Sequence, residues 1–222
     1  MTLPSHPTVS ILGVGGIGLP IARLWSRAGH RLVLGSRTPD RLRSGIESLG
    51  ITADIVTPSE AARRADIALL AVPYPALAEL AEAVATDLDG TIVIDATNPM
   101  GLADDGRIIS TLDDGRASGV HTAELLPSST VVRAFSHVME ELLWPRGTGQ
   151  SKFWGMAVAG DDYNAKAVTS GLISDAGFEP VDIGTLAESS PLDPGGALFP
   201  NMFTPEDLRI TAGVSIPVAV GR

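Results

Sequence analysis

The sequence predicts an α/β fold with a Rossmann-like, doubly wound and mostly parallel sheet that carries helices on both faces. Three observations predict it. Short apolar segments alternate with segments of helical periodicity, as strands do when crossover helices join them. The strand-like segments are apolar throughout, as in "DIALLAVP" at 66–73, which is typical of strands buried on both faces. The glycine-rich "GVGGIG" at 13–18 follows the first strand and opens a helix, as the first turn of this fold does.

The first half of the chain contains five expected strands and four expected helices. Residues 8–14 predict an apolar strand, and a helix at 16–29 follows it and ends at Gly29. The helix at 57–65 is well marked, because Thr57 is a capping residue and a proline and a glutamate follow at the positions that favour a helix start. The remaining elements are strands at 31–36, 51–56, 66–73 and 91–99, and helices at 39–48 and 75–86.

The second half continues the alternation after a Gly/Asp-rich loop at 101–119. The expected elements are a helix at 121–126, a strand at 130–135, a helix from about 138, a strand at 153–159, a helix at 162–176 and a strand at 178–183. No shift in composition marks a boundary, so we expect one domain over 1–222. It comprises a dinucleotide-binding core at 8–187 and an irregular, proline-rich C-terminal tail at 188–222.

Composition excludes several classes of function. The net charge is −10, which disfavours nucleic acid and anionic membrane surfaces as partners. The chain has no cysteine, so disulfides, thiolate metal sites and a cysteine nucleophile are excluded. No cluster of His, Asp and Glu has the spacing of a metal site, so no metal is expected. The N-terminal residues lack the pattern of a signal peptide, and no apolar run is long enough to span a membrane. We therefore expect a cytoplasmic protein.

The glycine-rich stretch predicts a dinucleotide site. Gly13, Gly15 and Gly18 form a G-x-G-x-x-G array between an apolar strand and an amphipathic helix. In this context the first glycine permits a tight turn, the second lets the backbone approach a pyrophosphate, and the third lets the helix pack close to the strand. The N-terminus of the helix then faces the phosphates.

The end of the second strand selects the form of the cofactor. An acidic residue there would bind the ribose hydroxyl of NAD, but this chain has Ser36 and Arg37. A hydroxyl and a guanidinium suit a 2′-phosphate, and Arg41 could add a second positive charge one turn later. The sequence therefore predicts NADP(H) as the cofactor.

With these residues in place, the chain resembles the NADPH-dependent coenzyme F420 reductases (F420H2:NADP oxidoreductases), whose fold also forms the reductase domain of membrane ferric reductases. The resemblance covers about 8–187, and its motifs are "ILGVGGIG", "LVLGSR", "DIALLAVP", "VIDATNP", "VVRAF", "VAGDD" and "GFEPVDIGTL". It implies hydride transfer between NADPH and a 5-deazaflavin, with a small molecule as the partner and a homodimer as the assembly.

The resemblance also implies which residues hold the ligands. Those placed at the pyrophosphate are Gly13, Val14, Gly16 and Ile17, and those placed at the 2′-phosphate are Ser36, Arg37 and Arg41. Val72, Pro73 and Asn98 would flank the nicotinamide, and Ala134 and Phe135 would border the deazaflavin. Two departures from the family concern the second ligand. The segment 133–137 reads "RAFSH" where relatives read "KAFNT", and the proline-rich tail replaces an apolar helix.

Three residues are candidates for a direct chemical role. His137 could donate a proton to a ketone or imine because its ordinary pKa is near neutrality; the alternative is a histidine that caps a helix or faces solvent. Ser136 is its neighbour, and Tyr74, next to the expected nicotinamide site, could stack or donate. Asp95 lies in an apolar strand and needs polar partners, so we expect a structural role in ordering the loop at 97–99.

The sequence thus predicts an NADP(H)-dependent oxidoreductase that exchanges a hydride with coenzyme F420. Two alternatives remain. One is an NADPH-dependent reductase of another small molecule, a ketone, an imine or an enoyl compound, for which Ser136, His137 and Tyr74 are the donor candidates. The other is a non-catalytic NADP(H)-binding module.

Overall fold

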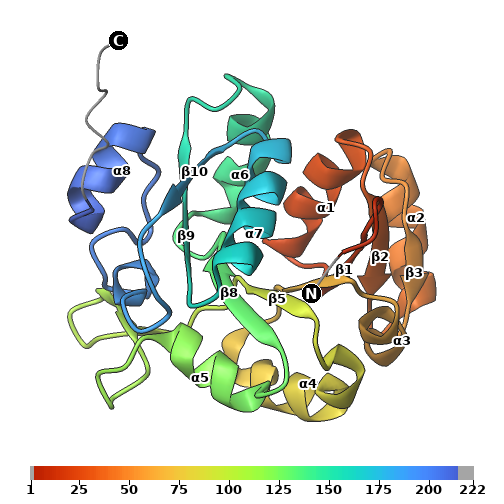
Figure 1. Cartoon of the computed structure of the whole chain (residues 1–222), viewed down its shortest axis with the longest axis horizontal. Helices are drawn as coiled ribbons and strands as arrows, with labels where there is room; N and C mark the ends of the chain where they lie inside the picture. The colour runs from red at the N-terminus through yellow and green to blue at the C-terminus, as the bar shows by residue number, and fades with distance from the viewer. Residues whose placement is uncertain (1–2, 215–222) are drawn as a thin grey trace.

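An eight-stranded sheet forms the centre of the computed structural model, which describes residues 3–214 (Figure 1). The strand order is β10-β9-β8-β5-β4-β1-β2-β3. The strands are β1 Thr8–Leu12, β2 Arg31–Gly35, β3 Asp54–Val56, β4 Ile67–Leu70, β5 Ile92–Asp95, β8 Thr130–Ala134, β9 Gly155–Gly160 and β10 Glu179–Asp182. The six strands from β8 to β3 are parallel, whereas β9 pairs with β8 in the antiparallel direction and with β10 in the parallel one. The predicted mostly parallel sheet is confirmed.

Helices cover both faces of this sheet, and Figure 1 shows α1, α6 and α7 on one side and α3, α4 and α5 on the other. The helices are α1 Gly18–Arg27, α2 Pro39–Ser48, α3 Pro58–Arg63, α4 Leu77–Val84, α5 Ser118–Leu125, α6 Glu140–Thr148, α7 Tyr163–Asp175 and α8 Pro205–Ala212, with short 3₁₀ turns η1 Tyr74–Ala76, η2 Thr86–Leu88 and η3 Ser190–Leu192. The expected cap at Thr57 is confirmed, because its side chain accepts a hydrogen bond from the backbone N–H of Glu60.

Each face of the sheet has its own apolar core. On the α1 side, Trp25 and Phe135 are fully buried and pack edge to face with ring centroids 5.8 Å apart. The indole N–H of Trp25 donates to the carbonyl of Leu172 in α7, 2.9 Å away. The other face buries side chains of β4 and β5 against the alanine-rich α3 and α4. Burial on both faces explains why the strands read as apolar runs.

Two parts of the C-terminal half differ from the prediction. The segment 101–119 was expected to be a loop, but β6 Met100–Leu102 and β7 Ile108–Ser110 form an antiparallel hairpin within it. In the tail, 190–204 is largely irregular as expected, whereas α8 is a helix with Thr204 as its cap and Gly213, at φ 71°, as its end. The sequence of α8 has little helical periodicity, but its capping residues and its apolar contact with β9 stabilise the helix. Tail residues 215–222 lie outside the described part of the chain.

The strand order positions a ligand crevice. β1 connects to β2 on one side, and the chain then crosses to β4 on the other side of β1. In open α/β sheets, ligands bind outside the carboxyl ends of the strands at such a reversal. Within residues 3–214, no helix has the length and apolar content needed to cross a bilayer.

Candidate functional site

A cavity of about 650 Å³ opens at the carboxyl ends of β1, β2 and β4. The residues at these strand ends that line it include seven of the predicted cofactor residues: Gly13, Val14, Gly15, Ser36, Arg37, Val72 and Pro73. Leu42 of α2 and Leu80 of α4 add apolar walls. The cavity therefore lies at the predicted crevice and has the mixed apolar and polar lining of a small-molecule site.

The glycine loop has the backbone geometry that a dinucleotide site needs. Gly13 has φ 104°, and a Cβ atom on it would lie 2.6 Å from the carbonyl oxygen of Ala71, so only glycine fits. A Cβ atom on Gly18 would collide with the carbonyl oxygen of Gly13, which keeps α1 close to β1. Nothing lies within 4 Å of the Cβ position of Gly15. The loop thus leaves open space at Gly15, where a phosphate could approach the backbone, and its backbone geometry fits an NADP(H) pyrophosphate.

The serine and arginine after β2 line the same cavity. The backbone N–H of Ser36 donates to the carbonyl of Val56 at 2.9 Å, and the Ser36 hydroxyl accepts from the N–H of Thr38 at 3.1 Å. Arg37 is exposed, and within residues 3–214 neither Arg37 nor Arg41 forms an ion pair. Arg37 lines the cavity and Arg41, in α2, does not. An unpaired guanidinium beside a hydroxyl suits a 2′-phosphate.

Tyr74 begins η1, directly after the cavity residues Val72 and Pro73. It is half-buried and, like Val120 of α5, packs against the apolar core on the face of the sheet that α3 and α4 cover. Burial, followed by the negative charge of Asp95, raises the pKa of the Tyr74 phenol above its ordinary value of 10.0. The phenol is therefore neutral at neutral pH and able to donate a hydrogen bond.

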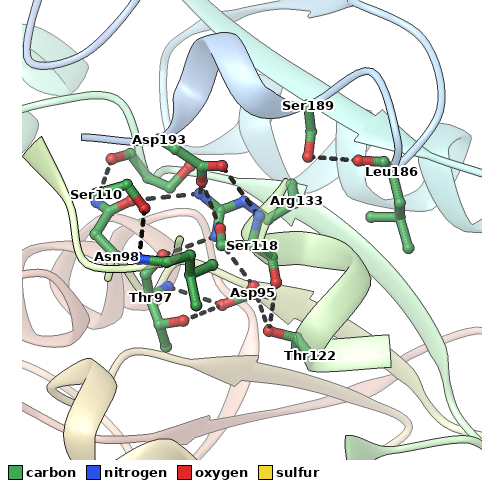
Figure 2. Close-up of polar contacts among 12 residues, drawn as sticks. Asp95, Thr97, Asn98, Ser110, Ser118, Thr122, Arg133, Leu186, Ser189 and Asp193 are labelled. Carbon is green, nitrogen blue, oxygen red and sulfur yellow. Dashed lines mark hydrogen bonds and ion pairs between the residues drawn. The ribbon is translucent and has the colours of Figure 1, made fainter. Parts of the chain in front are cut away.

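A buried ionic network lies beyond β5 and β8, on the other side of the crevice (Figure 2). Arg133 of β8 is fully buried and donates to Asp95 of β5 at 3.1 Å and to Asp193, after η3, at 3.0 Å. Asp193 also accepts from the backbone N–H of Ser118 at 3.0 Å, at the start of α5. Thr122, one turn later, donates to Asp95 at 2.8 Å. The network therefore joins two central strands, α5 and the C-terminal tail.

This network orders the loop that carries Asn98. Asp95 accepts hydrogen bonds from the backbone N–H and the hydroxyl of Thr97, at 2.8 and 2.7 Å, so its expected structural role is confirmed. Arg133 donates to the side-chain oxygen of Asn98 at 3.3 Å, and the Asn98 amide donates to the carbonyl of Ser136 at 2.6 Å. Asn98 thus bridges the loops after β5 and β8, and its side chain is held in one orientation.

The turn after β8 buries most of the residues that were expected to face the second ligand. Ala134 and Phe135 are fully buried. Phe135 has φ 61°, an unusual value for a bulky residue, and its ring packs on Trp25 instead of bordering a ligand. Ser136 is only 1% exposed, and its hydroxyl has no hydrogen-bond partner among the described residues.

The structure contradicts the expected role of His137 as a proton donor. Its side chain is fully buried, one ring nitrogen lies 3.1 Å from the carbonyl of Asn201, and the other accepts from the N–H of Ala157 at 3.1 Å. Burial lowers the pKa of His137 to about 4. A neutral imidazole with both nitrogens bonded to backbone groups has no proton to give near neutral pH, so His137 tethers the tail to β9.

Sequence reasoning missed Arg133 and Asp193 of the buried network, and it missed Glu140, whose carboxylate lies over Gly16 of the glycine loop. The signal for Arg133 was present, because "TVVRAF" places an arginine in an otherwise apolar strand, and this strand is the next predicted one after the strand that contains Asp95. A buried charge requires a partner of opposite sign. Asp193 carries no comparable signal, since it lies in a segment rich in polar residues and prolines, and Glu140 reads as an ordinary acidic residue at the start of a helix.

Comparison with known proteins identifies the family. Residues 8–99 match the model of the family described as NADP oxidoreductase, coenzyme F420-dependent. The crystal structure of a hypothetical protein from Sinorhizobium meliloti is 31% identical, with a TM-score of 0.79, and the match covers 90% of this chain and 96% of that one. Residues 8–99 therefore place the chain among the NADP-dependent oxidoreductases of this family.

Two further relatives are more distant. A protein from Arthrobacter sp. FB24, described as a proposed F420-dependent NADP-reductase, is 21% identical with a TM-score of 0.71, covering 82% of this chain and 86% of that one, and shows the same fold. Metalloreductase STEAP3 of Rattus norvegicus is 29% identical over 188 residues, which are 82% of this chain. The chain spans 35% of the length of that relative.

The buried His137 makes stability depend on pH. Its pKa is about 4 in the folded protein and about 6.5 when unfolded, so the unfolded chain binds the proton more readily. The contribution is complete above pH 6.5 and is lost as the pH falls toward 4, and it amounts to about 3 kcal/mol. Urea unfolding of the wild type and His137→Gln between pH 7.5 and 4.5 measures it.

We expect His137→Gln to be less stable than the wild type at pH 7.5, with a difference that shrinks as the pH falls. His6→Gln, at an exposed position, is the matched control and should follow the wild type throughout. A constant difference between the wild type and His137→Gln across the pH range would contradict a neutral, buried imidazole.

Proposed function

We propose that this protein transfers a hydride between NADPH and the deazaflavin of coenzyme F420, bound side by side across the carboxyl edge of the sheet. The observation that carries the proposal is the burial of His137 with both ring nitrogens occupied. His137, the expected proton donor, is therefore not available to a ligand at the carboxyl edge of the sheet. Hydride transfer between two rings depends on orientation and on exclusion of water more than on an acid or base.

The residues of the chain would bind and orient the two rings. The glycine loop would hold the pyrophosphate, and Ser36 with Arg37 would hold the 2′-phosphate. Val72 and Pro73 line the cavity and would form a wall against the nicotinamide, which supplies the hydride when NADPH is bound. Asn98, fixed by Arg133 and by the carbonyl of Ser136, would set the position of the second wall. The reducing direction also consumes one proton, which water can deliver to the deazaflavin.

A second candidate function follows from Tyr74. Tyr74 follows the cavity residues Val72 and Pro73 in the chain, and its phenol is protonated at neutral pH, since burial raises its pKa further above the ordinary value of 10.0. A neutral donor at that place favours reduction of a carbonyl or imine, in which the carbon receives the hydride and the oxygen or nitrogen receives a proton. The unpartnered hydroxyl of Ser136 is buried, so Tyr74 is the better donor.

We also propose that the protein is a homodimer and that it is located in the cytoplasm.

The assignment of the 2′-phosphate has a direct test. Arg37→Ala should weaken NADPH binding about 10- to 100-fold, because a charge-assisted hydrogen bond contributes about 1.5–3 kcal/mol. NADH lacks the 2′-phosphate, so its affinity should change about two-fold at most. Nicotinamide fluorescence titrations measure both. Arg43→Ala is the control, since Arg43 is exposed on α2 and pairs with Asp40 at 3.7 Å. Equal losses for NADPH and NADH in Arg37→Ala would show that Arg37 does not bind the 2′-phosphate.

The hydride acceptor is tested by mixing the protein with NADPH and oxidised coenzyme F420 and following the visible absorbance of the deazaflavin. We expect rapid bleaching that is stoichiometric with NADPH oxidation. No bleaching by a protein that still binds NADPH would reject the deazaflavin. Turnover of a panel of cyclic imines and ketones, lost in Tyr74→Phe, would then support the second candidate. NADPH binding without turnover of any acceptor would indicate a non-catalytic binding module.

A further inference from the structure

The side chain of Glu140 covers part of the glycine loop. The carboxylate of Glu140 lies directly over Gly16, in the place where a side chain at position 16 would begin. Glu140 is the first residue of α6, far from the loop in sequence. The loop is where the pyrophosphate of a dinucleotide is expected to approach the backbone. A negative carboxylate and a negative phosphate group therefore compete for neighbouring space.

The backbone that carries Glu140 is held in place. The guanidinium of Arg23 in α1 stacks over the ring of Trp144 in α6, 3.6 Å from its centroid. Leu143 is fully buried, and a Cβ atom on Gly147 would lie 2.9 Å from the side chain of Leu24. These contacts pack α6 closely against α1, whose N-terminus belongs to the glycine loop. The start of α6 cannot retreat from the loop without losing this packing.

The side chain itself is free to move. Glu140 is exposed, and within residues 3–214 its carboxylate makes no hydrogen bond and no ion pair. Its position in the first turn of α6 is favourable for a negative charge, but the neighbouring Glu141 satisfies the same preference. The helix dipole therefore does not explain why Glu140 lies over Gly16.

We propose that Glu140 is an electrostatic determinant of cofactor affinity, which covers the glycine loop in the free protein and turns outward when NADP(H) binds. The inference rests on the assignment of the glycine loop as the dinucleotide site. The carboxylate disfavours the bound state twice, because it must leave the loop and because its charge then remains close to the phosphates. Affinity for NADP(H) is thereby lower than the glycine loop and Arg37 alone would give.

Direct binding tests this inference without any hydride acceptor. NADPH is titrated into the wild type, Glu140→Gln and Glu141→Gln, and nicotinamide fluorescence reports the dissociation constant. We expect Glu140→Gln to bind NADPH about three- to ten-fold more tightly. Glu141→Gln removes the same charge from the same turn of α6 and should stay within about two-fold of the wild type. Thermal unfolding of the three proteins checks that the fold is kept.

The other outcomes overturn the inference in distinguishable ways. Unchanged affinity in Glu140→Gln would show that the carboxylate is not in the path of the phosphates. Weaker binding would show that Glu140 accepts a hydrogen bond from the bound cofactor. An equal gain in NADPH affinity in both variants would show that the effect comes from the net charge of the protein and not from the position of Glu140. If neither the wild type nor the variants bind NADPH, the cofactor assignment itself fails, and the inference fails with it.

Discussion

The arrangement of the acceptor side of the sheet depends on the buried guanidinium of Arg133. It lies between the carboxylates of Asp95 and Asp193 and reaches the side chain of Asn98. Removing one member of such a buried set leaves an unpaired charge in the protein interior, which typically costs about 3–5 kcal/mol. The positions of β5, β8, α5 and the tail are therefore coupled. The loops after β5 and β8 are fixed by the same hydrogen bonds.

The two halves of the crevice are built on different principles. On the cofactor side, backbone geometry determines the shape of the site, because Gly13 and Gly18 let strand, turn and helix approach more closely than a Cβ atom would allow. On the acceptor side, side-chain hydrogen bonds fix the loops, from Arg133 through Asn98 to the carbonyl of Ser136. The first arrangement suits any dinucleotide, whereas the second can be changed by a few substitutions.

Much of this structure was predictable from the sequence, because local patterns determine it. The apolar runs predicted the strands, Thr57 predicted a helix start, and the glycines with Ser36 and Arg37 predicted the residues that line the cavity. The hairpin at β6 and β7 was missed because its strands have three residues each and lie in a Gly/Asp-rich segment. The helix α8 was missed because it is short and packs against the distant strand β9. His137 shows a further limit, because its burial is set by Ala157 and by Asn201, 20 and 64 residues away. Partners at such separations leave no periodic trace in the sequence.

The most direct test is a crystal structure of the protein with NADP⁺. The bridging phosphates should lie on the backbone of the loop from Gly13 to Gly18, with the 2′-phosphate against Ser36 and Arg37. The nicotinamide should point toward Val72, Pro73 and Asn98, leaving its reactive face open to a second ring. A cofactor bound away from the glycine loop, or with its 2′-phosphate turned from Arg37, would contradict this assignment of the crevice.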